Sequence, residues 1–438
     1  MQKNKKKRTK IQEIKTSFTG GTLTNYSGIK TFHTFMQILG LINSLDSLSI
    51  KLHHNAKYST GTILSTVILG ILSGMNRIKK IEQFTYDPLL QSLFGLEGSI
   101  SDSTISDRMK RFSMKQTTEF MDLNGRMSKK VHLKLKTQTD ILDIDSTPKT
   151  VYGVQEGAEK GFNTQKKGKK SYHPLMGFLD SSRECILSWL RPGNTYTANN
   201  ADEFLKQAFT MLHKGIKQML VRADSGFFSD KIISVIEKKK DFNYLIKVKL
   251  KNMKSVLSGQ DWYDIPCMPN TQICDFDYRP ESWDKSRHFS AVRKVKAIHT
   301  EGHIFPFIEW QYFCYCTDIE DSPLQIHRLY GDRGTSENWI ENVKNHMFAG
   351  QLLTNDFWTN EAMWLSSVMA YNVSVWMRKL CDEKSWHEEP STFRSWFVQL
   401  AGKIVRSGRC LYLKMYKAYY YKERWRKIEN AVDNLIFA

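Results

Sequence analysis

One stretch of the chain, residues 330–344, reads YGDRGTSENWIENVK and combines cations, a phenol and carboxylates at helical spacing. If it forms a helix, each residue advances about 100°, and four side chains share an arc of roughly 60°. These four are Tyr330, Arg333, Glu337 and Lys344. A carboxylate binds a hard cation and Arg and Lys bind phosphates, so this face suits a metal beside a nucleic-acid backbone. The alternative on spacing alone is a solvated charged face, and Gly331 and Gly334 weaken the helix prediction.

Two further carboxylates stand at the ends of predicted strands. Asp145 ends an alternating strand, 140–145, and Asp224 directly follows the strand 218–222 and Ala223. Asp143 lies on the same face as Asp145, because residues two apart in a strand point the same way, so either could reach a metal.

The elements around these aspartates have a characteristic order. We predict strands at 140–145, 173–179 and 185–190, a helix at 200–214, a strand at 218–222, a helix at 230–239 and a strand at 244–249. Three strands, helix, strand, helix, strand is the order of a ribonuclease-H-like α/β sheet. The ends of its first and fourth strands lie side by side at the edge where ligands bind. Asp145, Asp224 and Glu337 are therefore predicted to converge.

Three such carboxylates can hold two divalent ions that activate a water or a 3′-hydroxyl for in-line phosphoryl transfer. Mg²⁺ is the expected ion, because it is hard and keeps coordination sites open for water and phosphate oxygens, and Mn²⁺ is expected to substitute.

The rest of the chain divides into regions around this predicted core. We expect a basic flexible arm at 1–30, a helical DNA-binding region at 31–136 and the core at 137–249 and 323–380. Aromatic and β-branched runs predict an all-β insertion at 250–322, and 381–438 is expected to be basic and helical. Within the last region, the Tyr-rich run 414–427 is either a DNA-facing helix or, preferably, a solvated surface.

Two basic segments are candidates for contacts with nucleic acid. Residues 98–112 place capping residues before a short basic helix that could read DNA through Arg108 and Lys110. The loop 161–170 carries Lys166, Lys167, Lys169 and Lys170. It does not have the glycine and lysine spacing of a nucleotide-binding phosphate loop.

The charge balance points to a polyanionic partner. The chain has 64 Lys and Arg against 45 Asp and Glu, a net charge of +19. The best apolar run, 63–72, is much shorter than the ~20 residues of a membrane span, so a membrane partner is not expected. An odd number of scattered cysteines, seven, argues against a disulfide framework. We expect a soluble intracellular protein whose partner is nucleic acid.

These motifs resemble those of the DDE insertion-sequence transposases. The segments are LDIDST around Asp145, RADSGF around Asp224 and the pattern Y-x2-R-x3-E-x6-K from Tyr330 to Lys344. LRPGN and YGVQEGAEKGFN resemble the branch called insertion-sequence family thirteen-eighty. The resemblance implies binding of terminal inverted repeats, end cleavage and joining of 3′-OH ends to target DNA, by a cut-and-paste or related route in a homodimeric synaptic complex.

The resemblance also assigns roles to single residues. Asp145, Asp224 and Glu337 would hold two Mg²⁺ ions, and Tyr330, Arg333 and Lys344 would hold DNA phosphates. One of three insertion aromatics, Trp262, Trp283 or Trp310, would stack on a flipped base. The alternatives are a ribonuclease-H-like nuclease without strand transfer and a domesticated DNA-binding regulator.

Overall fold

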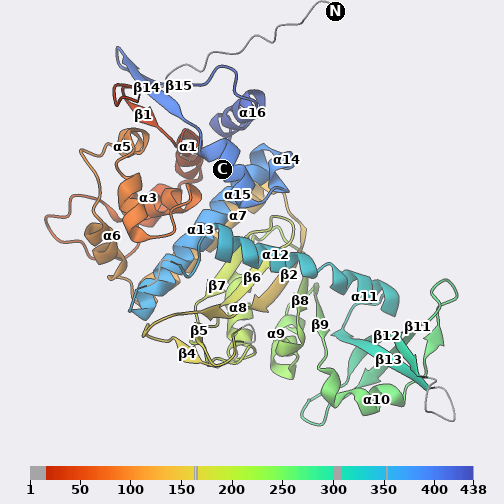
Figure 1. The fold of residues 1–438 in the computed structure, drawn as a ribbon. Coiled ribbons are helices and arrows are strands. Elements are labelled where there is room, and N and C mark those ends of the chain that lie inside the picture. Colours follow the sequence, from red (N-terminus) through yellow and green to blue (C-terminus); the bar gives the residue numbers. More distant parts are fainter. Residues whose placement is uncertain (1–15, 162, 164–165, 300–306, 352–353, 438) are drawn as a thin grey trace, which may run out of the picture.

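The computed structural model describes residues 16–161, 163, 166–299, 307–351 and 354–437. Figure 1 shows a central sheet, a group of helices packed around the long helix α13 (Phe357–Cys381), and a β-rich lobe at the other end of the molecule. The basic residues of the predicted N-terminal arm, 1–10, lie outside the described residues. Within the predicted arm, β1 (Leu23–Thr24) already pairs with β14 (Gly402–Ser407), so ordered structure begins before residue 30.

The central sheet has the predicted order of strands. Its core consists of β2 (Thr139–Ser146), β6 (Leu175–Leu179), β7 (Cys185–Trp189), β8 (Gln218–Ala223) and β9 (Phe242–Lys247). In space they lie as β7-β6-β2-β8-β9, with β2, β8 and β9 mutually parallel and β6 and β7 antiparallel to their neighbours. This is the 3-2-1-4-5 arrangement of the ribonuclease-H-like fold, which confirms the predicted fold class.

Helices cover both faces of this sheet. On β6, Phe178 lies 5.9 Å from Trp339 of α12 (Gly334–Glu341) and 6.2 Å from Tyr371 of α13, measured between ring centroids. The neighbouring Gly177 faces the other way, because side chains alternate along a strand. A Cβ atom there would lie 3.3 Å from Phe204 of α8 (Ala201–Met211). The helix α9 (Asp230–Glu237) packs beside α8 and against β9.

The N-terminal third is helical, as its periodicity predicts. Its helices are α1 (Ile29–Leu39), α2 (Leu41–Asp46), α3 (Thr60–Leu72), α4 (Ile78–Phe84), α5 (Pro88–Phe94), α6 (Asp102–Met109) and α7 (Met114–Leu135). α3 is buried along almost its whole length and packs against α13, while α7 packs against both α13 and β7. These contacts join the N-terminal helices to the central sheet through one hydrophobic core.

The predicted insertion extends the same sheet instead of forming a separate one. Its strands are β10 (Tyr263–Asp264), β11 (Thr271–Tyr278), β12 (Arg287–His299) and β13 (Phe307–Thr317). β13 pairs antiparallel with β9, so these four strands and the five strands of the core form one nine-stranded sheet. The prediction of an all-β insertion from 250 is wrong at its start, because η2 (Leu250–Asn252) and α10 (Lys254–Ser258) precede β10, with Leu257 buried in the core.

The C-terminal region is not wholly helical, contrary to prediction. It contains α14 (Glu383–Trp386), α15 (Pro390–Phe393), the π-helical turn η4 (Arg394–Val398), the hairpin β14 and β15 (Cys410–Met415), and α16 (Lys422–Asp433). A positive-φ glycine, Gly408, turns the hairpin. The β-branched and aromatic residues Ile404, Val405 and Tyr412 favour strands, a signal that the helical prediction overlooked.

The stretch 330–344 is not one continuous helix. α11 (Pro323–Gly331) ends before Asp332, α12 begins at Gly334, and the chain continues in the π-helical turn η3 (Asn342–His346). The two glycines flank this break, consistent with their poor helix propensity. The π turn shifts Lys344 from the position it would have on an ideal continuous helix.

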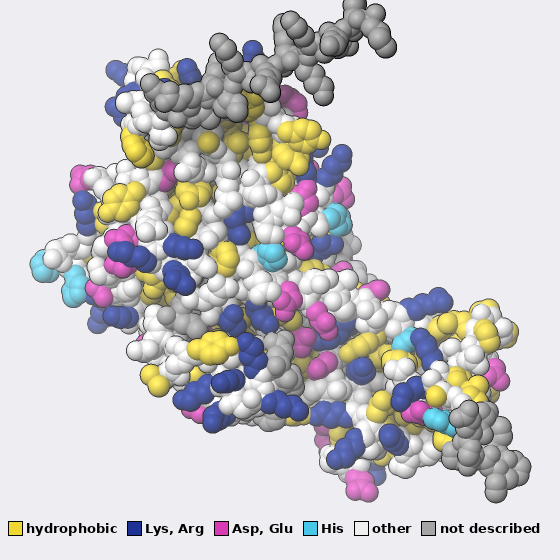
Figure 2. Space-filling view, in the orientation of Figure 1, with side chains coloured by type: hydrophobic (Ala, Val, Ile, Leu, Met, Phe, Trp, Pro, Cys, Tyr) yellow, Lys and Arg dark blue, Asp and Glu magenta, His cyan; other side chains and the backbone are white. Residues whose placement is uncertain are grey.

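The surface is strongly and unevenly basic. In Figure 2, dark blue side chains gather over the part of this face occupied by β4 (Glu159–Lys160) and β5 (Lys170–Tyr172). These strands form a small sheet with β3 (Lys149–Thr150). Within the described part of the chain, no helix is both long enough and apolar enough to cross a lipid bilayer.

Candidate active site

Two aspartates meet at the end of neighbouring strands. β2 and β8 are parallel, and their register pairs Ile144 with Ala223, so Asp145 and Asp224 are the next residues on the two strands. Burial raises the pKa of Asp145 to about 6, opposed by Arg333 and reinforced by the charge of Asp224. Asp224 caps the turn η1 (Ser225–Phe227) by accepting the Gly226 N–H at 2.8 Å. The predicted convergence of these two carboxylates is therefore present.

Asp143 is engaged elsewhere. Its carboxylate accepts two hydrogen bonds from the Arg222 guanidinium, each 2.8 Å long, and both side chains are buried. Arg222 also donates to the carbonyl of Leu329 in α11 at 2.9 Å. This pair ties the helix before the site to the sheet, and it leaves Asp145 as the carboxylate that faces the site.

Arg333 is the direct partner of Asp145. Its Nη2 atom lies 3.0 Å from Asp145 Oδ2 and 3.2 Å from the carbonyl of Ile144. Burial would lower the pKa of Arg333, but the charges of Asp145, Tyr330 and Asp224 outweigh it and raise the pKa. The guanidinium therefore stays charged and offsets the negative charge of the two aspartates.

Tyr330 stands beside this ion pair. Its ring packs 4.8 Å from Tyr315, and the ammonium of Lys247 lies 5.9 Å from its ring centre. Burial, with the nearby aspartates, raises the pKa of Tyr330 to about 12. Its hydroxyl thus remains protonated and can donate a hydrogen bond.

Lys344 reaches the opposite end of the site from the π turn. It is buried, and its Nζ atom donates to the Thr147 hydroxyl at 3.0 Å and lies 3.5 Å from Glu341. Burial lowers the pKa of Lys149 and the charge of Lys344 lowers it further, whereas the Glu341 carboxylate raises it and Lys166 adds a smaller lowering. The ammonium groups of Lys344 and Lys166 thus lie close enough to affect Lys149, with the Glu341 carboxylate beside them.

Lys149 was missed by the sequence reasoning. It follows the Ser-Thr-Pro break after Asp145 and lies on β3, opposite Tyr172 of β5, near enough to Lys344 for the two charges to interact. The signal available in the sequence was the position of Lys149, a positive charge four residues after Asp145.

Glu337 lies on an exposed side of α12. The buried positions of α12 are Ser336, Trp339 and Ile340, whereas Glu337 is exposed on the neighbouring side. Among the described residues, no group of three or more His, Cys, Asp or Glu side chains is arranged to hold a metal ion. In this structure Glu337 is therefore not part of a preformed set of three ligands, and its role as the third ligand stays a prediction.

The aspartate pair by itself suits a hard divalent cation. Mg²⁺ usually takes only one or two protein carboxylates together with water and phosphate oxygens. Asp145 and Asp224 are close enough for the charge of one to raise the pKa of the other, a cost that a bound cation would remove. The residues present fit such an ion.

Comparison with known proteins identifies the family. The family described as Transposase DDE domain group 1 matches residues 6–436, nearly the whole chain. The chain belongs to this family. DDE transposases generally use divalent metal ions, in agreement with the aspartate pair.

Other comparisons are weaker. No curated protein sequence matches the transposase. Among solved structures, it is similar to the piggyBac transposase synaptic complex with hairpin DNA, with 12% identity, a TM-score of 0.47, and coverage of 84% of this chain and 79% of that one. The Mos1 transposase paired-end complex with left transposon end has 12% identity and a TM-score of 0.18, with 44% and 60% coverage.

Two glycine-containing motifs of the transposase meet in space. A Cβ atom on Gly193 of LRPGN would lie 2.0 Å from the carbonyl oxygen of Ser171, and one on Gly161 would lie 2.4 Å from that of Gly193. Arg191 of the same motif donates to the carbonyls of His173, Thr197 and Asn199. These contacts hold the small sheet that carries Lys149 against the core.

The other predicted DNA-binding residues are scattered. Arg108 is buried and donates to the Thr60 hydroxyl and the Tyr58 carbonyl, both at 3.0 Å, so its guanidinium is used inside the helical region. Lys110 is exposed at the end of α6. In the basic loop, Lys166 bonds to the Tyr152 hydroxyl at 2.7 Å, Lys167 and Lys169 are exposed and Lys170 is half-buried.

The candidate stacking tryptophans differ in environment. Trp283 is buried against Phe228, whereas Trp262 and Trp310 are half-buried. The guanidinium of Arg293 lies 4.4 Å from the ring centre of Trp262 and 4.3 Å from that of Trp310. The latter two indoles therefore enclose one cation on the lobe formed by β10 to β13.

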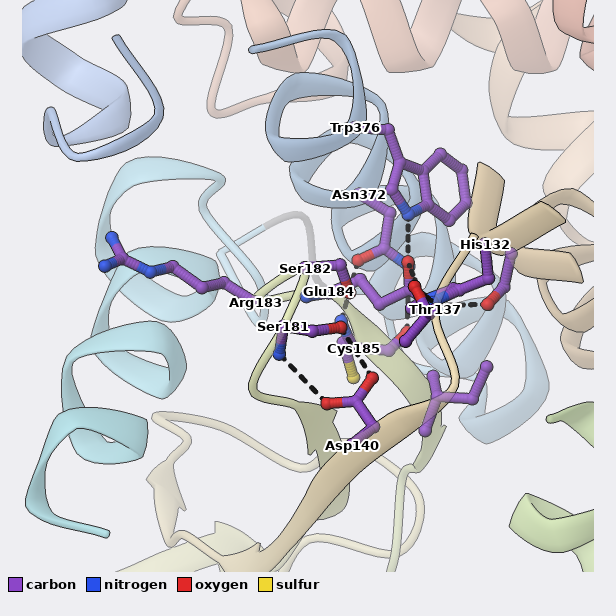
Figure 3. Close-up of polar contacts among 12 residues, drawn as sticks. His132, Thr137, Asp140, Ser181, Ser182, Arg183, Glu184, Cys185, Asn372 and Trp376 are labelled. Carbon is purple, nitrogen blue, oxygen red and sulfur yellow. Dashed lines mark hydrogen bonds and ion pairs between the residues drawn. The ribbon is translucent and has the colours of Figure 1, made fainter. Parts of the chain in front are cut away.

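A second cluster of titratable groups lies inside the transposase and is structural (Figure 3). Glu184 is fully buried and accepts hydrogen bonds from Ser128 of α7 and Trp376 of α13, with His132 Nε2 at 3.5 Å. Beside it, Asn372 pairs with the backbone of Cys185 through two hydrogen bonds of 2.8 Å. The turn between β6 and β7 is thereby joined to α7 and α13, away from the aspartate pair.

Proposed function

We propose that this transposase binds the terminal inverted repeats of its mobile element, cleaves the ends and joins the 3′-OH ends to target DNA by a cut-and-paste route. The observation that supports this best is the pair Asp145 and Asp224 at adjacent strand ends with Arg333 bound to it. The family match and the insertion-sequence family thirteen-eighty motifs point to the same chemistry. The element ends and target are double-stranded DNA, and bringing two ends together implies a homodimer.

Asp145 and Asp224 would hold Mg²⁺, two ions per site, with Glu337 as the third ligand on motif spacing alone. When bound, these ions would activate the attacking oxygen and stabilise the leaving one. Tyr330, protonated, would donate to a phosphate oxygen of the end, and Arg333, whose Nη2 is paired with Asp145, would add positive charge beside it. Lys344, with Lys149, attracts the next phosphate. Such an enzyme works with DNA in the bacterial cytoplasm, at the nucleoid.

The decisive test uses the DNA that flanks the reading frame. Imperfect inverted repeats a short distance outside both ends are expected. Duplexes carrying these ends, incubated with Mg²⁺ and target plasmid, should be cleaved and joined to the plasmid. Supplying pre-cut ends separates the alternatives: a nuclease without strand transfer would leave them unjoined. A domesticated regulator would bind the ends and show no Mg²⁺ or Mn²⁺ binding in a titration.

Lys344→Ala is expected to weaken end binding and to reduce its salt dependence. Removing one phosphate contact lowers the slope of log K against log salt by about 0.9. Lys149→Ala should act in the same direction, because the two ammonium groups face one anion site. The measurement is fluorescence anisotropy with a labelled end duplex over a range of KCl concentrations. An unchanged slope for Lys344→Ala would remove it from the phosphate contacts.

A further inference from the structure

A groove lies between the C-terminal hairpin and α16, remote from the aspartate pair. It has a volume of about 490 Å³, and its lining includes Lys414, Tyr416, Lys417, Tyr419, Lys422 and Arg426. Figure 1 shows β14, β15 and α16 at the top of the molecule, whereas β2 and β8 lie below α13. The groove is therefore a second surface and not part of the active site.

The charge of this surface is strongly one-sided. Residues 402–427 contain nine Lys and Arg and a single acidic residue, Glu423. Of these cations only Arg424 is held in close ion pairs, at 2.9 Å to Asp382 and 2.7 Å to Glu388. Within the described chain, Lys414 and Lys417 form no ion pair, and Glu423 lies 3.7 Å from Lys422 and 3.9 Å from Arg426. Among the described residues, Lys414 and Lys417 are thus without a carboxylate partner, and Lys422 and Arg426 share the single carboxylate of Glu423.

The hairpin places like charges opposite each other. Lys403 of β14 and Lys414 of β15 are direct cross-strand partners, and both are exposed. Like charges at such positions destabilise a pair of strands. A polyanion lying along the hairpin would remove this repulsion.

Exposed aromatic rings stand among these cations. The exposed fractions are 50% for Tyr412, 69% for Tyr416 and 89% for Tyr420. Tyrosine hydroxyls donate to phosphate oxygens, and the rings pack on sugars. This mixture suits a nucleic-acid backbone better than an acidic protein patch.

The groove rests on a rigid base. Trp425 is buried, donates from its indole N–H to the Phe397 carbonyl at 3.0 Å and stacks on Phe397 at 5.4 Å. Tyr419 donates to the carbonyl of Trp396, which fixes the loop between β15 and α16. The cations are consequently presented by a preformed surface.

We propose that this groove, defined by Lys414, Tyr416, Lys417, Lys422 and Arg426, binds the phosphate backbone of duplex DNA at a distance from the cleavage site. The inference rests on the proposed function only in taking that duplex to be the subterminal part of the element end. The groove would lengthen the contact between protein and DNA and carry part of the affinity without touching the scissile phosphate.

The test compares two charge-matched triple variants of the full chain. Lys414→Gln, Lys417→Gln and Arg426→Gln together should reduce the salt slope of binding to an end duplex by about 2 to 3, since each lost phosphate contact removes about 0.9. The control replaces the exposed Lys238, Lys239 and Lys240 at the end of α9 with Gln and should leave the slope unchanged. All these side chains are exposed, so circular dichroism should show both variants folded.

A second variant separates ring contacts from charge. Tyr416→Ala with Tyr420→Ala should weaken end binding several-fold at an unchanged salt slope. Nuclease footprinting should show that the triple groove variant loses protection in the interior of the end, while protection around the cleavage site persists.

Specific outcomes would overturn the proposal. These are an equal slope for groove and control variants, an unchanged footprint, or groove-dependent binding to phosphatidylserine vesicles in place of DNA, which would assign an anionic membrane surface. The two proposals can fail separately. If pre-cut ends are never joined, the proposed function is refuted. If the groove variant in the same experiments still shows a reduced salt slope and reduced nuclease protection, DNA binding by the groove is nevertheless supported.

Discussion

Replacing Asp145 or Asp224 with Asn is expected to abolish cleavage of the element ends while leaving end binding within a few-fold of the unchanged protein. Each substitution removes the negative charge that would hold a divalent ion and keeps the size of the side chain. Losing several kcal/mol of transition-state stabilisation lowers the rate by roughly a thousandfold or more. The measurement is release of the cleaved strand on a denaturing gel, with Mg²⁺ and with Mn²⁺, beside anisotropy for end binding.

The matched control is Asp321→Asn, an exposed aspartate before α11, which should cleave normally.

Glu337→Gln is expected to behave like the aspartate variants. Because Glu337 is exposed on α12 in this structure, the Glu337→Gln variant tests whether this residue is a metal ligand more directly than the aspartate variants do. Full cleavage by Glu337→Gln would remove it from the site and leave Asp145 and Asp224 in place, whereas full cleavage by Asp145→Asn would refute the proposed chemistry.

Glu184→Ala is expected to lower the free energy of unfolding by about 3–5 kcal/mol, because it leaves His132 buried without its charge partner. It also removes the acceptor for Ser128 and Trp376. Urea unfolding followed by tryptophan fluorescence measures the loss. Glu203→Ala, whose side chain is 58% exposed on α8, is the control and should stay within about 0.5 kcal/mol of the unchanged protein.

The buried pair His132 and Glu184 predicts that the stability of the fold depends on pH. Burial would lower the pKa of His132 and raise that of Glu184, but their mutual attraction outweighs burial, raising the pKa of His132 and lowering that of Glu184. Charged His132 therefore stabilises the fold below its unfolded pKa, about 6.5, and this is lost as pH rises through the folded pKa. Glu184 stabilises above its unfolded pKa, about 4.3, and this is lost as pH falls through the folded one.

The stability difference between the unchanged protein and Glu184→Gln should therefore be largest between about pH 4.3 and 6.5. It should shrink at higher pH as His132 loses its proton. A difference that stays constant across this range would show that the pair is not ionised.

Much of the fold was predictable from local pattern. Alternating strands, helical periodicity and the order of elements from 137 to 249 predicted the ribonuclease-H-like sheet, because these signals depend on neighbouring residues. The low helix propensity of Gly331 and Gly334 signalled the break between α11 and α12. The exposed position of Glu337 on α12 was not predictable in this way. The C-terminal hairpin was missed, because residues 402–415 were grouped with the basic, tyrosine-rich run 414–427 that follows them.

By itself, the sequence determined which carboxylates stand at strand ends and which strands carry them, because side-chain type and element order are local properties. Only the tertiary structure decided that Arg222 engages Asp143 and Arg333 faces Asp145. It also brought Lys149 to Lys344 and placed the C-terminal cations around one groove. These outcomes depend on contacts between segments far apart in the chain, whose pairing is set by packing of the whole core and not by spacing along the sequence.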